Sequence, residues 1–421
     1  MAAYRFVHTA DIHLDSPLRS LSLRNPELAA LIGNATRQAL ARTVELCLDE
    51  QVDALLLAGD LYDGEQTSMK TARFLAEQLR RLGEAGIETF IVRGNHDAMS
   101  KITRELTFPD TVTLFKGRAE AIPAKRLSTG LPVVVHGLSF AQPQAPESLV
   151  GKYRPPVEGA VNIGLMHTSV GGSPDHDPYA PCSIAELNGA GYRYWALGHI
   201  HKRQVTSGAA TVVMPGIPQG RDINEDGAKS VSLVTIGDDG AVSVEERFVG
   251  VAQFERVRVA LDGIEDWSGV IEAVADGLRR TKGDTVLPHL VARLQLTGAT
   301  PLAWRVRRDL DLLKEEAELL ATGAGNVWIE KLEADCRPPS AAAPSGDALA
   351  ELARLVDDEV LSSPGFAAES IAILKELQSR LPLEVRRLFG DDLTVLDAAA
   401  AELAREGAAD VVARLQAAGR V

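Results

Sequence analysis

Five short clusters in the first 201 residues carry side chains that can bind divalent metal ions. The groups are carboxylates, imidazoles and one amide. Such a set suits manganese, iron or zinc better than magnesium, which prefers oxygen ligands and retained waters. In chain order the clusters are Asp11-Ile-His13, Gly59-Asp60, Gly94-Asn95-His96-Asp97, His167 and Gly198-His199-Ile-His201.

Each cluster alone has an ordinary structural explanation. An Asp-x-His after a strand is usually a turn or a helix cap, and a single histidine such as His167 is more often a hydrogen-bonded core residue than a ligand. The combination is more specific, because only 9 of the 421 residues are histidine and five of them lie in these clusters. We therefore interpret the clusters as parts of one metal site.

Buried strands must position these clusters. The apolar runs Tyr4–Ala10, Asp53–Gly59 and Ile87–Arg93 predict strands, and the amphipathic helices between them favour parallel pairing. Further strands are predicted at Val133–Leu138, Val161–Met166, Tyr192–Leu197, Val231–Ile236 and Val242–Arg247. The clusters follow the strands directly, and the carboxyl ends of strands in an α/β sheet line one crevice. The sequence thus predicts an α/β core with strands predominating later, as two facing sheets.

The pattern divides the chain into four parts. Residues 1–250 form the α/β core, and residues 251–336 are expected to form a small α/β domain that includes one long helix at Pro301–Leu320. Residues 337–346, rich in proline, alanine and serine, are interpreted as a linker. Residues 347–421 are expected to be helical, with 8 basic and 14 acidic side chains, which fits packing on protein better than binding to nucleic acid.

The composition limits the classes of partner. Acidic residues outnumber basic ones by 58 to 44, so the net charge is −14 and no broad basic surface for a polyanion is expected. No apolar run approaches the length of a membrane span, and the N-terminus has no signal-peptide core. The three cysteines are odd in number and far apart, which favours a reducing cytoplasm.

The five clusters resemble the calcineurin-like metallophosphoesterases, whose pattern is D-x-H, G-D, G-N-H-[DE], H and G-H-x-H. Within that family the chain is similar to SbcD-type DNA repair exonucleases, and among these to the YhaO-like branch. The segments that carry this likeness are HTADIHLDSPL (8–18), GDLYDGE (59–65) and MPGIPQGRDINEDGAKS (214–230). The resemblance implies a two-sheet β-sandwich flanked by helices, with residues 251–336 as a capping domain.

The resemblance also implies a role for each residue of the clusters. One metal ion would lie among Asp11, His13, Asp60 and His201, and the other among Asp60, Asn95, His167 and His199, with Asp60 bridging. The ions, most simply two Mn²⁺, would be about 3.5–4 Å apart and would activate a shared hydroxide as the nucleophile.

Other residues are expected to act on the substrate. His96 would protonate or stabilise the leaving alkoxide, with Asp97 or a backbone group orienting it; a purely structural role for His96 is the alternative. Ser16 and Arg221 could hold the substrate phosphate, although surface or capping roles are open for both. Asp63 stands where some relatives have a second catalytic histidine.

We therefore expect a Mn-dependent DNA nuclease in DNA repair, a 3'-5' exonuclease or an endonuclease, whose partner is an SbcC-like coiled-coil ATPase. The C-terminal helices could grip that partner or cap the chain's own core.

Relatives form dimers through helices of the phosphoesterase domain, which leaves a homodimer open. One alternative function is that of a small-molecule phosphodiesterase or nucleotide pyrophosphatase of the same superfamily. A protein phosphatase fits less well, and a non-catalytic scaffold is disfavoured by the intact ligand set.

Overall fold

The computed structural model describes residues 3–16, 26–62, 68–99, 108–125, 131–139, 145–171, 179–337, 339, 348–381 and 393–418. The chain divides into two units. The first consists of Met1–Glu255 with Asp284–Val291, and the second of Arg256–Gly283 with Ala292–Val421. The five clusters all lie in the first unit.

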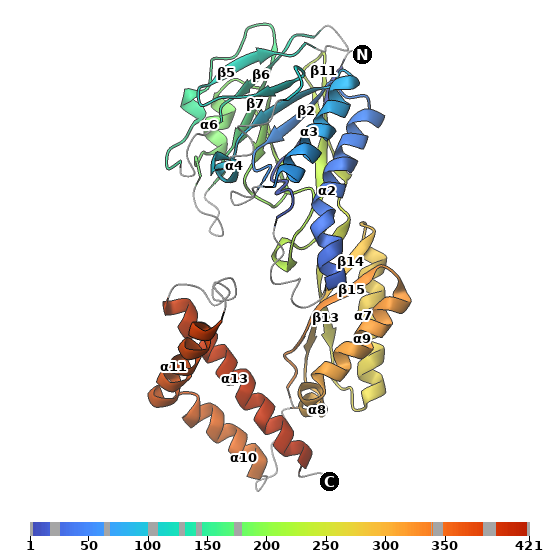
Figure 1. Ribbon diagram of the computed structural model, residues 1–421, viewed down its shortest axis with the longest axis vertical. Helices are drawn as coiled ribbons and strands as arrows, with labels where there is room; N and C mark the ends of the chain where they lie inside the picture. The colour runs from blue at the N-terminus through green and yellow to red at the C-terminus, as the bar shows by residue number, and fades with distance from the viewer. Residues whose placement is uncertain are drawn as a thin grey trace. The chain divides into compact units, whose positions relative to one another are not determined.

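Two six-stranded mixed sheets form the first unit (Figure 1). The first sheet has the order β12-β11-β1-β2-β3-β4, in which β1 to β4 are parallel and β11 and β12 are antiparallel. Its strands are β1 (Ala3–Thr9), β2 (Ala54–Ala58), β3 (Glu88–Val92), β4 (Val112–Leu114), β11 (Ser230–Gly237) and β12 (Val242–Phe248).

The second sheet has the order β5-β6-β7-β8-β10-β9, with four parallel strands between two antiparallel edges. Its strands are β5 (Glu120–Pro123), β6 (Val133–Gly137), β7 (Val161–His167), β8 (Tyr194–Gly198), β9 (Gln204–Ser207) and β10 (Thr211–Met214). The expected α/β fold with two facing sheets is confirmed.

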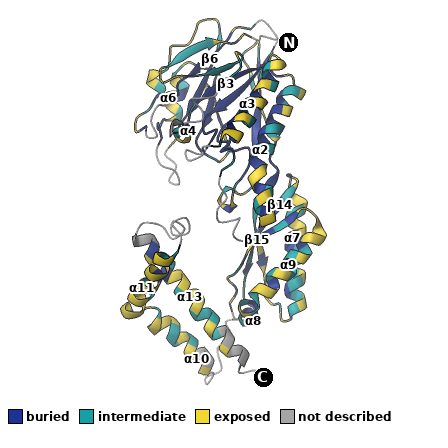
Figure 2. Ribbon diagram, viewed as in Figure 1, coloured by how far each residue is buried: buried dark blue, intermediate teal, exposed yellow. Residues whose placement is uncertain are grey.

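Apolar side chains from both sheets meet in a buried layer between them. Phe6, Leu56 and Phe90 from the first sheet belong to the same cluster as Ile163 and Tyr194 from the second. Figure 2 shows these central strands buried. Burying a side chain of this size contributes about 1.5–3 kcal/mol, so this layer holds the two sheets together firmly.

Helices cover the outer faces of the sheets. On the first sheet, α2 (Pro26–Asp49) and α3 (Met69–Glu84) bury Leu40 and Leu75 among the outward-facing residues of β1, β2 and β3. On the second sheet, α6 (Ile184–Gly189) buries Leu187, whose carbonyl accepts a hydrogen bond from the indole of Trp195. Each sheet is thus covered on both faces, as a parallel α/β sheet requires.

The sequence did not predict four of the strands, namely β4, β5, β9 and β10. They are three or four residues long, which is too short for a recognisable strand pattern, and β9 is exposed throughout. Three of them, β4, β5 and β9, are edge strands, which are defined by their partner in the sheet rather than by their own composition.

A third sheet has the order β13-β14-β15, formed by Ala252–Ala260, His289–Thr297 and Val327–Ala334, and α7 (Trp267–Asp284) lies between its first two strands in sequence. Helical structure over the predicted span Pro301–Leu320 is confirmed, but it consists of two helices rather than one. These are α8 (Ala303–Arg308) and α9 (Leu310–Ala324), and Asp309 between them has a non-helical backbone, with φ −104° and ψ 28°. The Asp309 carboxylate accepts from the guanidinium of Arg308 at 2.7 Å.

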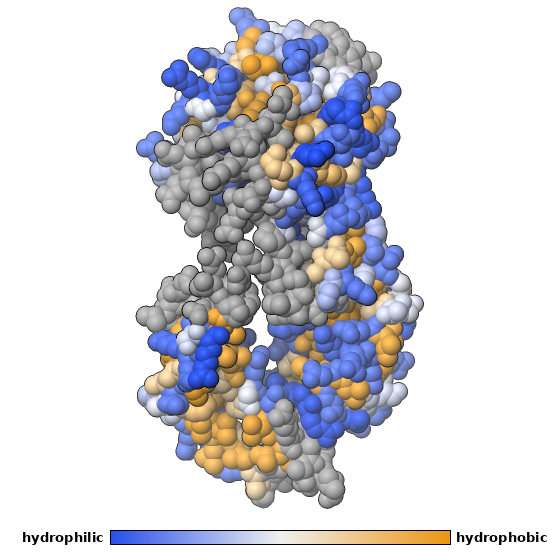
Figure 3. Space-filling model, in the orientation of Figure 1, coloured by the Kyte–Doolittle hydropathy of each residue, from blue (hydrophilic) through white to orange (hydrophobic). Residues whose placement is uncertain are grey.

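The described C-terminal residues are helical, in α10 (Ala348–Leu355), the π-helix η3 (Val356–Val360), α11 (Pro364–Arg380) and α13 (Leu393–Ala418). Figure 3 shows apolar side chains gathered on these helices. The exposed ones are Leu352, Val360, Phe366, Ile373, Leu377, Leu403, Val411 and Leu415. None of the described helices is long and apolar enough to span a membrane. Most of the predicted linker, residues 337–346, lies outside the described residues.

Candidate metal centre

The carboxyl ends of five strands bring the clusters to one edge of the sandwich. Asp11 and Asp60 follow β1 and β2, and Asn95 begins the short helix α4 (Asn95–Met99) after β3. In the second sheet, His167 is the last residue of β7 and His199 directly follows β8. The hydrogen bond from His167 Nδ1 to the Ala58 carbonyl at 2.9 Å shows that the two sheets meet here.

The first ligand group consists of Asp11, His13 and His201, whose candidate donor atoms all lie within 4.8 Å of one another. His13 Nε2 and His201 Nε2 are 3.2 Å apart, so both imidazoles direct a ring nitrogen to the same small volume. One carboxylate and two imidazoles are a common donor set for a divalent transition metal.

The second ligand group consists of Asp60, His167 and His199, again with donor atoms within 4.8 Å of one another. His167 Nε2 lies 3.4 Å from Asp60 Oδ2 and 3.0 Å from Asn95 Oδ1, which adds the amide oxygen. The structure therefore gathers all seven residues that the sequence suggested as ligands. Their donors fit a pair of divalent ions of the manganese, iron or zinc type.

Hydrogen bonds fix the orientation of two of the imidazoles. His167 Nδ1 binds the Ala58 carbonyl at 2.9 Å, and His201 Nδ1 binds the Glu225 carboxylate at 2.8 Å. Because both partners only accept, each Nδ1 carries a proton, so in the neutral form of each ring the lone pair is on Nε2, which faces the ligand group. The tautomers needed for metal binding are thus set by the protein.

The backbone of four candidate ligands lies in the left-handed region, with φ of 50° at Asp11, 44° at His13, 50° at Asp60 and 106° at His199. Residues other than glycine rarely adopt this conformation, which costs about 1–3 kcal/mol each and persists only where the surroundings enforce it. The Asp11 carboxylate supplies one such restraint, since both of its oxygens accept from the His199 backbone N–H, at 3.1 and 2.9 Å. Conformational strain concentrated at these positions is typical of a functional site.

Gly94 leaves room for the second ligand group, because a Cβ at this position would lie 2.8 Å from both Asp60 Cγ and His167 Cε1. Gly94→Ala is expected to weaken metal binding and to destabilise the fold by about 1–3 kcal/mol, through displacement of these two side chains. Metal titration and denaturant unfolding would check this. Gly151→Ala is the matched control, since its Cβ would meet nothing within 4 Å. Equal effects of the two substitutions would contradict the steric explanation.

The charges of the second ligand group are strongly coupled in the metal-free protein. Burial lowers the pKa of His167. The carboxylates of Asp60 and Asp11 and the Ala58 carbonyl raise it by more than this, so that the pKa is about 9. Burial raises the pKa of Asp60, yet His167, His13 and His96 together hold it well below its usual range. At neutral pH the metal-free group therefore contains an imidazolium beside a carboxylate.

Metal binding is expected to strengthen as the pH rises. A metal ion binds only the neutral imidazole, so below the His167 pKa of about 9 binding must release a proton. Affinity should then rise by about tenfold per pH unit between about pH 7 and pH 9. Calorimetric titration with Mn²⁺ in buffers of different ionisation enthalpy measures the protons released. Affinity independent of pH, with no proton release at pH 7, would contradict the expectation.

His96 and Asp97 have different environments. His96 is exposed, and its ring centroid is 5.0 Å from that of His13, while its backbone N–H donates to Asp60 at 3.0 Å. Asp97 is buried and accepts from the backbone N–H groups of Leu61, Tyr62 and Gly94 at 3.0, 3.2 and 3.1 Å. The sequence suggested that Asp97 or a backbone group orients the His96 ring, which stays a prediction; these contacts show that the Asp97 carboxylate ties the loops after β2 and β3 together.

The environment of Asp97 also changes its acidity. Burial and the nearby Asp60 charge raise the pKa of Asp97 to about 7, against the lowering effect of the three backbone donors. Its three hydrogen bonds hold the backbone beside Asp60 and Asn95 in place.

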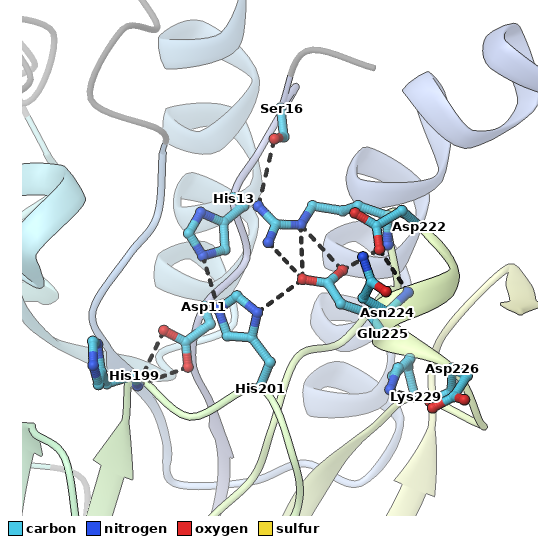
Figure 4. Close-up of polar contacts among 11 residues, drawn as sticks. Asp11, His13, Ser16, His199, His201, Asp222, Asn224, Glu225, Asp226 and Lys229 are labelled. Carbon is cyan, nitrogen blue, oxygen red and sulfur yellow. Dashed lines mark hydrogen bonds and ion pairs between the residues drawn. The ribbon is translucent and has the colours of Figure 1, made fainter. Parts of the chain in front are cut away.

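Ser16 and Arg221 lie near each other at the site, with Arg221 Nη1 donating to Ser16 Oγ at 3.5 Å (Figure 4). We call them the Ser16–Arg221 pair. Asp63 lies outside the described residues.

Two residues of the site were not predicted. Glu225 binds His201, and its spacing of four residues from Arg221 was a usable sign of an ion pair. Asp15 lies two residues after the first cluster and is held by Arg37 at 2.7 Å and Thr71 at 2.5 Å. No sequence pattern identifies those partners, because they lie 22 and 56 residues away.

Comparison with known proteins places this geometry in a family. Residues 4–203 match the calcineurin-like phosphoesterases, and residues 254–337 match the middle domain of the metallophosphoesterase YhaO. The chain is 33% identical over 321 residues to a protein of Bacillus subtilis described as uncharacterized metallophosphoesterase YhaO, covering 75% of this chain and 76% of that one. The chain therefore belongs to the calcineurin-like metallophosphoesterase family.

The chain is also similar, at lower identity, to two relatives whose names describe nucleases or DNA repair. The chain is 26% identical over 346 residues to the DNA double-strand break repair protein Mre11 of Methanopyrus kandleri, over 76% of this chain and 68% of that one. It is also 26% identical over 275 residues to the SbcD component of the nuclease SbcCD of Bacillus subtilis, over 55% of this chain and 66% of that one. Metallophosphoesterases bind a dinuclear metal site, which agrees with the two ligand groups found here.

Proposed function

We propose that this protein is a Mn-dependent DNA nuclease that hydrolyses phosphodiester bonds during DNA repair. The observation that carries the proposal is the pair of ligand groups, with three donor residues each, beside the exposed imidazole of His96. The relatives named as a nuclease component and as a DNA double-strand break repair protein support DNA as the substrate.

In this proposal the two ligand groups would each hold one divalent ion, and Asp60 would contribute a ligand to both. The bound ions would activate water for attack on phosphorus and neutralise charge on the phosphate oxygens. Ser16 and Arg221 would hold a phosphate oxygen through their hydroxyl and guanidinium donors. His96 would donate a proton to the leaving alkoxide, since its ring is exposed beside His13. Asp97 would hold the loops that carry Asp60 and Asn95.

The rest of the chain would supply a capping domain and a surface for a protein partner. Residues 251–336 would form the capping domain that the family resemblance implies, and the helices after the linker would bind an SbcC-like coiled-coil ATPase. The apolar side chains exposed on α10, α11 and α13 support a protein-binding role for these helices. With a net charge of −14, the isolated chain is proposed to take most of its DNA affinity from that partner. Three free cysteines favour the cytoplasm as the compartment.

A panel of substrates tests the proposed function. The protein would be incubated with Mn²⁺ and end-labelled single- and double-stranded DNA, beside bis-p-nitrophenyl phosphate and cyclic nucleotides. We expect cleavage of DNA that chelation of the metal abolishes. Turnover of the small diesters or of nucleotides with uncut DNA would instead favour the small-molecule phosphodiesterase. Mixing with the ATPase should strengthen DNA binding, whereas strong salt-sensitive binding by the isolated chain would contradict the partner proposal.

A further inference from the structure

One carboxylate connects the first ligand group with the Ser16–Arg221 pair. Glu225 is the last residue of the short 3-10 helix η2 (Ile223–Glu225) and accepts a hydrogen bond from His201 Nδ1 at 2.8 Å (Figure 4). It also accepts from the Arg221 guanidinium, from Nη2 at 2.5 Å and Nε at 3.2 Å, and from the Arg221 backbone N–H at 2.8 Å. Glu225 therefore contacts a candidate metal ligand and a candidate substrate ligand at once.

The surroundings hold this carboxylate in place. Its side chain is only 9% exposed, and four donors from two residues fill its oxygens. Charge-assisted bonds of this kind are shorter and stronger than neutral ones. The turn that carries Glu225 is closed by a hydrogen bond from the Asn224 N–H to Asp222 at 2.7 Å. Rotation of the Glu225 side chain would break several of these bonds together.

The consequences for its two partners follow from the geometry. Because His201 donates through Nδ1, its Nε2 is directed to His13 Nε2, 3.2 Å away, inside the first ligand group. Because Glu225 occupies the Nε and Nη2 edge of the Arg221 guanidinium, the Nη1 edge is directed toward Ser16. The carboxylate thus determines which nitrogen of each partner faces the site.

We propose that Glu225 is a positioning residue that orients the His201 imidazole for the metal ion and the Arg221 guanidinium for the substrate phosphate. The inference rests on the proposed function of the site, in that a phosphodiester is the substrate. It assigns Glu225 two separable effects. The effect on metal affinity passes through His201, and the effect on substrate affinity passes through Arg221.

Substitutions separate the two effects. Glu225→Gln should weaken Mn²⁺ binding at the first ligand group by about 10- to 100-fold, as removal of a partner of a metal-binding histidine usually does, and should also raise KM. Arg221→Gln should raise KM and leave Mn²⁺ affinity unchanged. In the double variant KM should be no higher than in Arg221→Gln alone, because Glu225 is proposed to affect substrate affinity only through the Arg221 side chain, which is already missing. Mn²⁺ affinity would be measured by calorimetry and electron paramagnetic resonance, and KM at saturating metal.

Asp222, in the same turn as Glu225, provides the control. Asp222→Asn removes a negative charge from the same turn but keeps the side-chain oxygen that accepts from the Asn224 N–H, so this variant should bind Mn²⁺ like the wild type. Wild-type Mn²⁺ affinity in Glu225→Gln, or an equal loss in Asp222→Asn, would overturn the proposal. So would a KM in the double variant well above that of Arg221→Gln. The metal titration needs no turnover, and KM can be measured on whichever diester the wild type hydrolyses, so a failure of the nuclease proposal would be recognised separately.

Discussion

Asp60→Asn is expected to lower kcat by about a thousandfold or more and to reduce the amount of bound metal, which is the largest single effect we expect. Asp60 is buried, and its carboxylate lies 3.4 Å from His167 Nε2 and accepts from the His96 N–H at 3.0 Å. Metal ions contribute several kcal/mol of charge stabilisation in such reactions, and each 1.36 kcal/mol is about tenfold in rate. Loss of the proposed bridging charge should remove most of that stabilisation.

The Asp60 substitution needs both a kinetic and a metal measurement. Metal content after dialysis and steady-state hydrolysis of a phosphodiester would be measured on the same sample. Asp239→Asn, in the turn between β11 and β12, is a matched control for loss of one carboxylate far from the ligand groups and should behave as the wild type. An Asp60→Asn variant that kept both metal ions and most of its activity would exclude Asp60 as the bridge.

His96→Gln is expected to lower kcat on DNA by about 10²- to 10⁴-fold while Mn²⁺ affinity stays unchanged, which is the range for loss of a general acid. The reason is that His96 lies outside both ligand groups, with an exposed ring beside His13. The loss should be much smaller on bis-p-nitrophenyl phosphate, because a nitrophenolate leaves without a proton whereas the alkoxide of DNA requires one.

Comparing DNA with the activated diester shows whether His96 protonates the leaving group. An equal loss on DNA and on the activated diester would mean that His96 does not protonate the leaving group. A loss of bound Mn²⁺ would mean that its role is structural, through the neighbouring His13 ring or the backbone bond to Asp60.

The position of the site could be predicted from the sequence because it depends on local rules. Short buried strands are recognisable by their apolar runs, and the polar residue that ends each run lies at the carboxyl edge of its sheet. His167 and Asp60 therefore come together although 107 residues separate them, and a hydrogen bond across the sheets fixes their approach. The two-sheet arrangement followed from the same pattern, together with the family resemblance.

Features that depend on distant partners could not be predicted in this way. Asp97 or a backbone group was expected to orient His96, but the sequence did not indicate that three backbone N–H groups, two of them from another loop, bind the Asp97 carboxylate. The break between α8 and α9 at Asp309 was missed for a different reason, since the apolar spacing continues across it. In both cases the deciding backbone geometry is not contained in the residue pattern.

The most direct test of the two-metal site is the anomalous scattering of a crystal soaked in Mn²⁺. We expect two peaks, one among Asp11, His13 and His201 and one among Asp60, Asn95, His167 and His199. They should be separated by about 3.5–4 Å, as in other two-metal sites, with Asp60 in contact with both. A single peak, or two peaks that these residues do not contact, would contradict the account.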